Sequence, residues 1–434
     1  MTVHALAMPP PRGACPGLSS PMPTGDGLLV RLLPIGTIPL AAVADLCDAA
    51  RRHGNSVIEV TSRGSLQFRG LSAASAPQFA AEIAALAIAA QESVPVLCNP
   101  LAGLDAQELY DSAALAADLR RALARNQLTT RLGAKVSVAI DGGGPLNLAK
   151  LAADIRLSAR VLNNGVALAV SVGGDEASAV HLGVVASANA VETVLRLLDV
   201  LARYDRDARA RDIVGGEGAA VFRSVVADLL ISTHPRDGRK MIPQKSVHSI
   251  GTHPLGNGVV ACGVGFAFGH ADAGALQGLA DAAGAAGASG LRAAPERTLL
   301  AIGLTPEAVP AFVAAAMELG FVGRPDDPRR HVVACAGAPI CASAHLASRA
   351  LAPLIATSVA PYLDGAFTIH VSGCAKGCAQ AAPATLTLVG VPGGCALIAD
   401  GSVRDTAFVI VPDSDLPAAV AKFARDRKPG GEHV

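Results

Sequence analysis

The chain has 434 residues, enough to bury a large core in roughly two to four domains or subdomains. Lys and Arg together number 36, as do Asp and Glu, so no overall charge draws the protein to nucleic acid or to an anionic membrane. No apolar run reaches the roughly 18 residues of a membrane span, and the first residues lack a basic segment followed by a sustained apolar stretch. We therefore expect a cytoplasmic protein with no membrane or nucleic acid partner. Aromatic residues make up only 3% of the chain, so the helices must pack through small side chains.

Two distant stretches share one pattern of predicted elements. The first has a strand at GLLVRLLPIG from Gly27, a helix over 39–54 and a strand-like segment over 56–71. The second has a strand over 258–269, a helix over 275–290 and a strand-like segment over 291–304. Arg63 and Arg297 fall at equivalent places in the last segments. This similarity indicates an internal duplication into paired domains, because the repeat distance is far too long for a solenoid.

The stretches that follow each unit are also related. A helix over 113–126, a strand over 134–144 and a hairpin near 166–174 follow the first unit. A helix over 347–360, a strand over 366–378 and a hairpin over 384–401 follow the second. The chain is thus predicted to be an α+β protein of order A-B-A′-B′ with mixed sheets. The expected boundaries are an N-terminal arm (1–24), a first half-domain (25–85), a first α/β domain (86–240), a second half-domain (246–310) after a charged linker, and a last domain (311–434).

Four cysteines form two close pairs in the last quarter of the chain. Cys335 and Cys341 delimit CAGAPIC, and Cys374 and Cys378 delimit CAKGC. Four thiolates suit an iron–sulfur cluster, and the surrounding glycines allow the backbone to approach a bulky inorganic core. Intervals of five and three residues disfavour a zinc ribbon, whose cysteines are separated by two. Burial of inert thiols in the core and disulfide formation are the remaining alternatives, although nine cysteines are an odd number.

The duplication, the segment TSRGSLQFRG and the two cysteine pairs resemble the nitrite and sulfite reductase hemoprotein superfamily. The resemblance spans roughly residues 25–400. It implies two ferredoxin-like half-domains that pair about a pseudo-twofold axis, two α/β domains, and a tetrapyrrole held beside a [4Fe–4S] cluster on Cys335, Cys341, Cys374 and Cys378. In the reductases, the cysteine that matches Cys378 bridges the cluster and the siroheme iron.

Within that superfamily, the runs 12–32 and HSIGTHPLGNGV near His248 resemble the precorrin-3B synthase branch. The resemblance implies oxygen-dependent hydroxylation of precorrin-3A with γ-lactone formation, a step of aerobic cobalamin biosynthesis. It also implies a [4Fe–4S] cluster, a mononuclear non-heme iron, a tetrapyrrole substrate and dioxygen. The G-x-G-x-x-G nucleotide motif is missing in its required context, so a separate reductase is expected to deliver electrons derived from NADH.

A tetrapyrrole with many carboxylates requires guanidinium groups that can pair with them bidentately. The candidates are placed on the duplicated strands and, for Lys135, on the strand after LGA. Residues i and i+2 of a strand share a face, so Ser65, Gln67 and Arg69 are expected on the side of Arg63; the alternative is an ordinary solvated strand. The predicted substrate-binding residues are Arg63, Gln67, Arg69, Lys135 and Arg297.

Some positions depart from the reductase pattern. Val94 and Ser137 stand where reductases have further cations for a small oxyanion, which favours dioxygen and a large macrocycle. Ala375, Lys376 and Gly377 lie between the second cysteine pair, and Gln380 follows it, so a bridging role of Cys378 is doubtful. The alternative function is a siroheme-dependent assimilatory sulfite or nitrite reductase, and a third is a non-catalytic tetrapyrrole or cluster carrier.

A mononuclear iron would take histidine and carboxylate ligands with open coordination positions. The candidates near the start of the second unit are His248, His253, His270 and Asp272, which form no compact motif; Cys15 is a further candidate on family resemblance alone. The sequence leaves the catalytic residues unassigned. The remaining cysteines are expected to have packing roles, namely Cys47, Cys98, Cys262 and Cys395.

Overall fold

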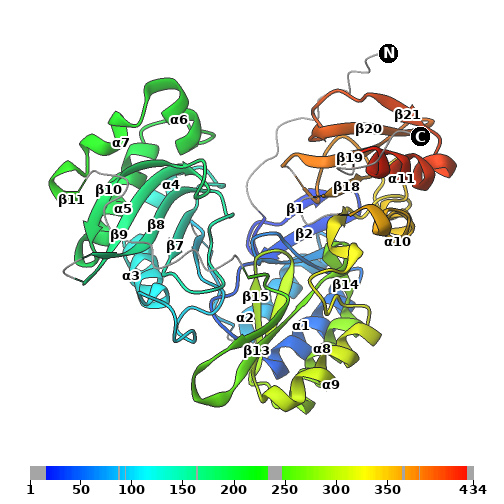
Figure 1. Ribbon diagram of the computed structural model, residues 1–434, viewed down its shortest axis with the longest axis horizontal. Coiled ribbons are helices and arrows are strands. Elements are labelled where there is room, and N and C mark those ends of the chain that lie inside the picture. Colours follow the sequence, from blue (N-terminus) through cyan, green and yellow to red (C-terminus); the bar gives the residue numbers. More distant parts are fainter. Residues whose placement is uncertain are drawn as a thin grey trace.

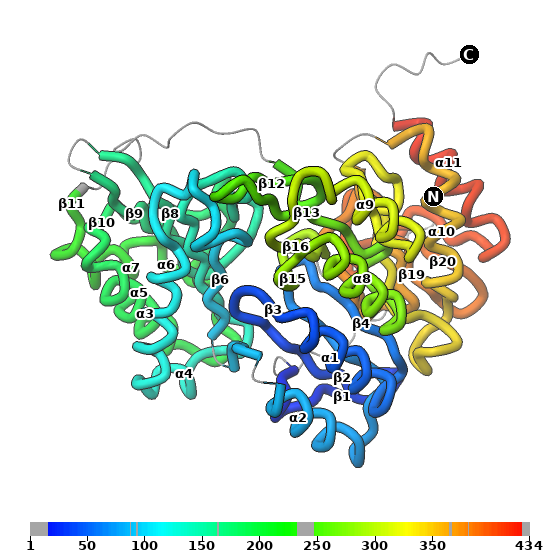
Figure 2. Tube along the Cα trace, turned by 90° about the horizontal axis from the view of Figure 1, so that it is seen from below, coloured from blue at the N-terminus to red at the C-terminus, as the bar shows by residue number. Residues whose placement is uncertain are grey.

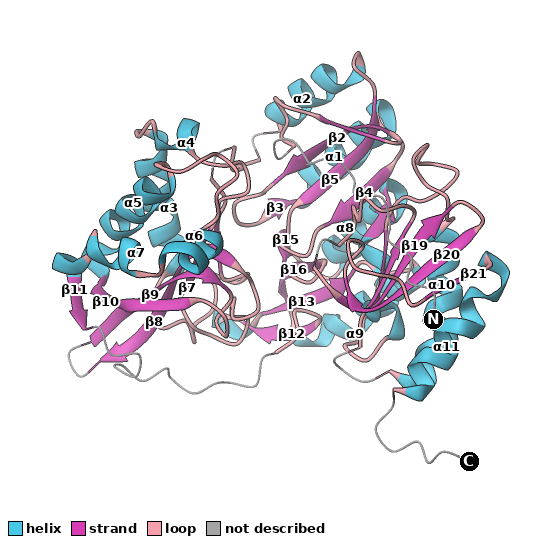
Figure 3. Ribbon diagram, turned by 90° about the horizontal axis from the view of Figure 1, so that it is seen from above, coloured by secondary structure: helices cyan, strands magenta, loops and turns pink. Residues whose placement is uncertain are grey.

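The computed structural model describes residues 16–427 except 87, 93, 163–164, 233–246, 364–366 and 381. These residues form four sheets with helices packed on them (Figure 1 and Figure 3). The 233–246 linker and Cys15 lie outside the described residues. Within the described part of the chain, no helix is long and apolar enough to span a membrane.

The first half-domain contains a five-stranded sheet of order β1-β2-β5-β4-β14. Four of its strands come from the first unit, and helices α1 (Leu40–His53) and α2 (Ser75–Ala85) pack together beside them. The fifth strand comes from the second unit and pairs antiparallel with β4. The strand bounds are Met22–Thr24 for β1, Gly27–Leu32 for β2, Leu66–Leu71 for β5, Val57–Val60 for β4 and His270–Asp272 for β14.

The second half-domain repeats this arrangement with the order β12-β13-β16-β15-β3. Its helices are α8 (Ala273–Ala285) and α9 (Val309–Glu318). Its outermost strand, β3, comes from the first unit and pairs antiparallel with β15. The strand bounds are Gly251–Pro254 for β12, Val260–Gly265 for β13, Thr298–Leu304 for β16, Gly290–Ala294 for β15 and Ile38–Pro39 for β3.

The two half-domains exchange edge strands and share one hydrophobic core. This core includes Leu46 of α1 and Leu279 of α8, both almost fully buried. Helices α1 and α8 pack directly against each other, as the tube view shows (Figure 2). Small residues such as Ala50 and Ala283 are buried in the same core, which accords with the expected packing through small side chains.

The first α/β domain contains a six-stranded sheet of order β11-β10-β9-β8-β7-β6. Strands β6, β7 and β8 are parallel, whereas β8 to β11 run antiparallel. The strands are β6 (Val96–Cys98), β7 (Val138–Asp141), β8 (Ala153–Leu162), β9 (Gly165–Gly174), β10 (Val180–Ala186) and β11 (Leu230–Ser232). The helices are α3 (Ser112–Ala124), α4 (Leu128–Arg131), α5 (Ala190–Leu201), α6 (Ala210–Glu217) and α7 (Ala220–Ser224).

The last domain repeats the same pattern with five strands. Strands β17, β18 and β19 are parallel, and β19, β20 and β21 are antiparallel. The strands are β17 (Val332–Ala334), β18 (Ile369–Ser372), β19 (Ala384–Val391), β20 (Gly394–Gly401) and β21 (Val409–Val411), with helices α10 (Ser348–Val359) and α11 (Leu416–Asp426). The four sheets confirm the predicted A-B-A′-B′ duplication and the α+β class.

The two strand-like segments that end the repeated units are each a hairpin of two strands. Strands β4 and β5 flank the turn 61–65, and β15 and β16 flank the turn 295–297. Gly64 has a φ of 79°, and Glu296 and Arg297 have φ values of 62° and 61°, so the backbone reverses there instead of staying extended. The expectation of one continuous strand in each segment was wrong.

Candidate functional site

The two cysteine pairs begin at the carboxyl ends of neighbouring parallel strands. Cys335 follows β17 and Cys374 lies two residues after β18, so the strand pairing brings both segments to one edge of the last sheet. The Cys335 amide donates to the Val371 carbonyl (3.2 Å), and the Gly373 amide donates to the Cys335 sulfur (3.1 Å). An amide aimed at a sulfur stabilises negative charge on that sulfur.

The second cysteine of the first pair is seated against the first half-domain. The Ala342 amide donates to the Gly25 carbonyl (3.0 Å), which attaches the cysteine loop to the turn between β1 and β2. A Cβ atom at Gly25 would lie 2.3 Å from the Cys341 sulfur and 3.1 Å from the Ala342 nitrogen. The absence of a side chain at Gly25 therefore leaves the space that the Cys341 sulfur occupies.

The thiols of Cys335, Cys341 and Cys374 are close enough to interact electrostatically. Burial raises the pKa of the Cys374 thiol, and negative charges on Cys335 and Cys341 raise it further. Cys378 is exposed and, with Cys335, lines a cavity. Cys47, Cys262 and Cys395 are instead buried in the core, where burial raises their pKa. Cys98 is half-buried at the end of β6 and also has a raised pKa because of burial.

Four cysteine thiolates are the donor set that a [4Fe–4S] cluster requires. Among the described residues, no three His, Cys, Asp or Glu side chains converge as they would on one metal ion. In a [4Fe–4S] cluster each cysteine binds a different iron, so the four sulfurs surround the cluster and do not converge on one point. The shared sheet edge, the amide aimed at the Cys335 sulfur and the position of Gly25 suit this arrangement.

A cavity of about 190 Å³ extends from Cys335 and Cys378 to the first half-domain. Its wall contains four arginines that the strands and turns bring from both units, namely Arg31, Arg63, Arg69 and Arg297. A larger cavity of about 730 Å³ adjoins it, with Ser62, Gly269, Arg297 and Val333 in both walls. The larger volume is in the range of cavities that bind sizeable ligands.

Arg297 is the cation between the two cavities. It lies in the turn 295–297, and within the described residues its guanidinium group makes no hydrogen bond or ion pair. Burial lowers the pKa of Arg297 to about 10, opposed by the charges of Glu296 and Glu59. A half-buried, incompletely paired guanidinium group is suited to bind an anion.

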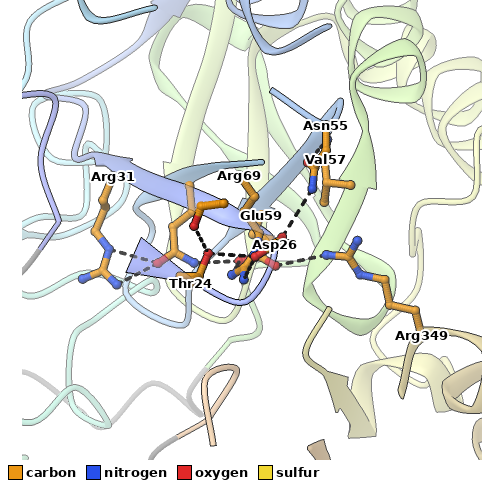
Figure 4. Close-up of polar contacts among 10 residues, drawn as sticks. Thr24, Asp26, Arg31, Asn55, Val57, Glu59, Arg69 and Arg349 are labelled. Atoms are coloured by element: carbon orange, nitrogen blue, oxygen red, sulfur yellow. Dashed lines mark hydrogen bonds and ion pairs between the residues drawn. The ribbon is translucent and has the colours of Figure 1, made fainter. Parts of the chain in front are cut away.

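A buried network of charged side chains supports the wall of the smaller cavity (Figure 4). Arg69 pairs bidentately with Asp26 through bonds of 2.7 and 2.8 Å, and its contact with Glu59 measures 3.4 Å. Glu59 also accepts hydrogen bonds from Gln67 (2.8 Å) and from Arg349 of α10 (3.2 Å). The network thus joins the first half-domain to the helix that follows the first cysteine pair.

The predicted substrate-binding residues have different surroundings. Arg63 lies in the turn 61–65 and not in a strand; it donates to the Ser137 hydroxyl (3.1 Å) and to the Ala152 carbonyl (2.9 Å). Gln67 and Arg69 lie on β5 and line the smaller cavity, and both are engaged in the network. Lys135 is exposed in a turn before β7, not in a strand, and does not line either cavity.

The candidate iron ligands do not form one group in the described residues. His253 is buried and bonds to the Ser249 carbonyl (3.1 Å), whereas His248 contacts Arg330 beside the larger cavity. Asp272 caps helix α8 by accepting from the Gly274 amide. His270 lies on β14, and burial followed by the Arg349 charge lowers its pKa to about 4. The four candidates thus have separate surroundings, and the ligands of a mononuclear iron stay unassigned.

The sequence did not identify Arg31, Asp26, Glu59 or Arg349 as site residues. A signal was present for two of them, because Arg31 and Glu59 interrupt the otherwise apolar strands GLLVRL and VIEV. A charge in a half-buried strand requires a partner or a ligand. Asp26 lies in a turn and Arg349 begins a helix, where charged residues are common, so neither position carries a distinct pattern.

Comparisons with known proteins agree with this geometry. Residues 20–86 match the family model "Nitrite/Sulfite reductase ferredoxin-like half domain". The chain is 38% identical over 416 residues to a precorrin-3B synthase of Sinorhizobium sp, covering 95% of this chain and 88% of that protein. It is 25% identical to a ferredoxin–nitrite reductase of Synechococcus elongatus, covering 82% of this chain and 75% of the relative.

A third relative is a ferredoxin sulfite reductase of Mycolicibacterium paratuberculosis, 25% identical over 82% of this chain and 68% of the relative. Among solved structures, the Mycobacterium tuberculosis NirA protein matches with a TM-score of 0.74 and 21% identity, over 94% of this chain and 82% of that one. This likeness confirms the predicted fold.

Replacing Asp26 by Asn should destabilise the protein in a pH-dependent way. Burial would raise the pKa of Asp26, but the hydrogen bond and charge of Arg69 outweigh it and hold the pKa below its ordinary 3.8. The ion pair therefore contributes fully above pH 3.8, and its contribution is lost as the pH falls through the lower folded-state value. Asp26→Asn should lower the free energy of unfolding at neutral pH by about 3–5 kcal/mol, and the difference should shrink in acid.

Urea unfolding followed by circular dichroism, at neutral pH and on either side of pH 3.8, measures this difference. The matched control is Asp48→Asn, which breaks an exposed pair with Arg51 and should cost at most about 1 kcal/mol. Equal effects of the two substitutions would contradict a dominant role of the buried pair.

Proposed function

The chain belongs to the precorrin-3B synthase family, and we propose that it hydroxylates precorrin-3A with dioxygen and closes a γ-lactone from a ring acetate in aerobic cobalamin biosynthesis. The observation that carries this proposal is one cavity lined both by Cys335 and Cys378 and by arginines from both units. A cluster on the cysteines could deliver electrons to a polycarboxylate that the arginines hold in the same cavity.

The substrate is proposed to extend across both cavities. A tetrapyrrole macrocycle exceeds the smaller volume of about 190 Å³, whereas the adjoining cavity provides about 730 Å³ more. Arg297 lies at the junction and can bind a substrate carboxylate. Arg31 and Arg63 contribute positive charge to the same wall, and Gln67 and Arg69 position it through the buried network. Lys135 has no role in this proposal.

The proposed cluster ligands are Cys335, Cys341, Cys374 and Cys378. A [4Fe–4S] cluster bound there would transfer electrons one at a time. Hydroxylation consumes one dioxygen, two electrons and two protons, and yields one substrate hydroxyl and one water. The electrons are proposed to come from NADH through a separate reductase. A mononuclear iron stays a prediction without assigned ligands.

The alternative is a sulfite or nitrite reductase with permanently bound siroheme, in line with the relatives at 25% identity. A small oxyanion would require further cations at the reaction centre. At the two positions expected from the reductase pattern, Val94 packs in the core of the first α/β domain and Ser137 is fully buried and accepts from Arg63. Neither residue lines the two cavities, so the support for the synthase over the reductase is the 38% identity over 95% of the chain.

The spectrum of the anaerobically purified protein tests both functions. We expect about four iron and four sulfide per chain, a broad cluster absorption and no Soret band, because the tetrapyrrole leaves as product. Cys378→Ser should lose most of the iron and sulfide, whereas the control Cys98→Ala should retain them, since Cys98 lies in the other α/β domain. A stoichiometric siroheme spectrum coupled to the cluster would favour the reductase.

A carrier would bind the cluster and the tetrapyrrole without turnover. Product formation with reductant, dioxygen and precorrin-3A separates the synthase from such a carrier. Lack of any product from protein with a full cluster would support the carrier.

Replacing Gly25 by Ala should impair cluster assembly without unfolding the half-domain. The new methyl group would occupy the space of the Cys341 sulfur, to which a Cβ at this position would lie 2.3 Å away. We expect reduced iron and sulfide after anaerobic reconstitution. Gly17→Ala is the control, because a Cβ there meets no atom within 4 Å. Full iron and sulfide in Gly25→Ala would show that Cys341 is not a required ligand in this position.

Removing the unpaired cation should weaken substrate binding. Arg297→Ala is expected to raise the dissociation constant for precorrin-3A by roughly tenfold to a hundredfold, since a hydrogen bond to a charged group contributes about 1.5–3 kcal/mol. Lys135→Ala should leave the constant unchanged, because Lys135 does not line the cavities. Anaerobic absorbance titration measures both. An equal effect of the two substitutions would remove Arg297 from the binding site.

A further inference from the structure

Arg349 is a partly buried cation between the cysteine loop and the cavity wall. It is the second residue of α10 and directly follows Ser348, whose hydroxyl lies 3.6 Å from the Cys335 sulfur. Its side chain is 14% exposed and reaches towards Glu59 in the first half-domain (Figure 4). Arg349 therefore lies beside a proposed cluster ligand, and its side chain extends to Glu59 in the wall of the smaller cavity.

The pairing of Arg349 is incomplete. One terminal nitrogen donates to Glu59 (3.2 Å), but Nε is buried and has no hydrogen-bond partner in the described part of the chain. Arg69, the other arginine of the network, is instead held bidentately by Asp26. Burial lowers the pKa of Arg349, whereas the charges of Glu59 and of the Cys335 thiolate oppose that decrease. Arg349 thus interacts electrostatically with Cys335.

The network contains four charges that cancel. Arg69 and Arg349 are positive, and Asp26 and Glu59 are negative. Removing Arg349 leaves a net negative charge beside the cysteines, and removing Glu59 leaves a net positive one. Because these side chains are largely buried, solvent screens the imbalance only weakly.

We propose that Arg349 and Glu59 set the reduction potential of the cluster on Cys335, Cys341, Cys374 and Cys378, with opposite signs. The inference rests on the proposed function, because it requires the cluster. Reduction adds one electron, and thus one negative charge, to the cluster. A buried positive charge beside Cys335 stabilises the reduced form and raises the potential, whereas the Glu59 carboxylate lowers it. Arg349 is a positioning residue that acts through Cys335.

The test is a potentiometric titration with dithionite, followed by the EPR signal of the reduced cluster. Arg349→Gln should shift the midpoint potential to a more negative value, and Glu59→Gln should shift it to a more positive one. The double variant should return close to the wild-type value, since it restores the charge balance. Arg349→Lys retains the charge and should also stay close to the wild type.

The matched control is Arg425→Gln on α11 of the same domain. Arg425 is 60% exposed and, in the described part of the chain, forms an ion pair with Asp426 at 3.6 Å, so its loss should not move the potential. Iron and sulfide content and circular dichroism are measured for every variant. If Arg349→Gln assembles no cluster, the positive shift of Glu59→Gln and the unchanged potential of Arg349→Lys still test the proposal.

Single variants that hold a full cluster but shift in the same direction, or do not shift, would overturn the tuning role and leave the proposed function standing. A wild-type protein that takes up no iron and sulfide would overturn the cluster assignment, and the tuning role with it. Opposite shifts that cancel in the double variant would establish the role, because loss of packing alone cannot produce shifts of opposite sign.

Discussion

The exchange of edge strands between the half-domains determines how the arginine-bearing turns of the two units lie relative to each other. Strand β14 completes the first sheet through β4, and β3 completes the second through β15, so each sheet depends on backbone hydrogen bonds from the other unit. The shared core fixes the two halves relative to each other. Consequently, the two arginine-bearing turns meet, and the Glu296 amide donates to the Ser62 carbonyl (3.1 Å).

The duplicated α/β domains show how one backbone arrangement supports two chemistries. Asn99 after β6 is equivalent to Cys335 after β17. Asn99 Oδ1 accepts from the Gly142 amide (2.7 Å), just as the Cys335 sulfur accepts from the Gly373 amide (3.1 Å). The serine that begins the next helix contacts each side chain, at 3.3 Å for Ser112 and 3.6 Å for Ser348. The fold supplies the amide and the hydroxyl in both halves, and the side chain decides whether the position is a polar core or a thiol site.

Local patterns in the sequence predicted the helices and the cysteine pairs, because each of these features lies within a short stretch of chain, and the recurrence of the same local patterns predicted the duplication. The exchanged strands could not be predicted, since β3 has two residues and β14 three, too few for a periodic pattern. The buried network was also missed. Its partners are distant in sequence, 43 residues apart for Asp26 and Arg69 and 290 for Glu59 and Arg349, and only the folded chain brings them together.

The asymmetry between Arg63 and Arg297 explains why a duplicated protein can have one site instead of two. The two arginines occupy equivalent turns, so the same fold would allow two equivalent anion sites. The first α/β domain satisfies Arg63 with the Ser137 hydroxyl and the Ala152 carbonyl. In the described residues Arg297 receives no such partner and lines both cavities beside the cysteine domain. Protein groups thus take the place of a ligand at one turn, and the other turn retains a cation that favours an anionic ligand.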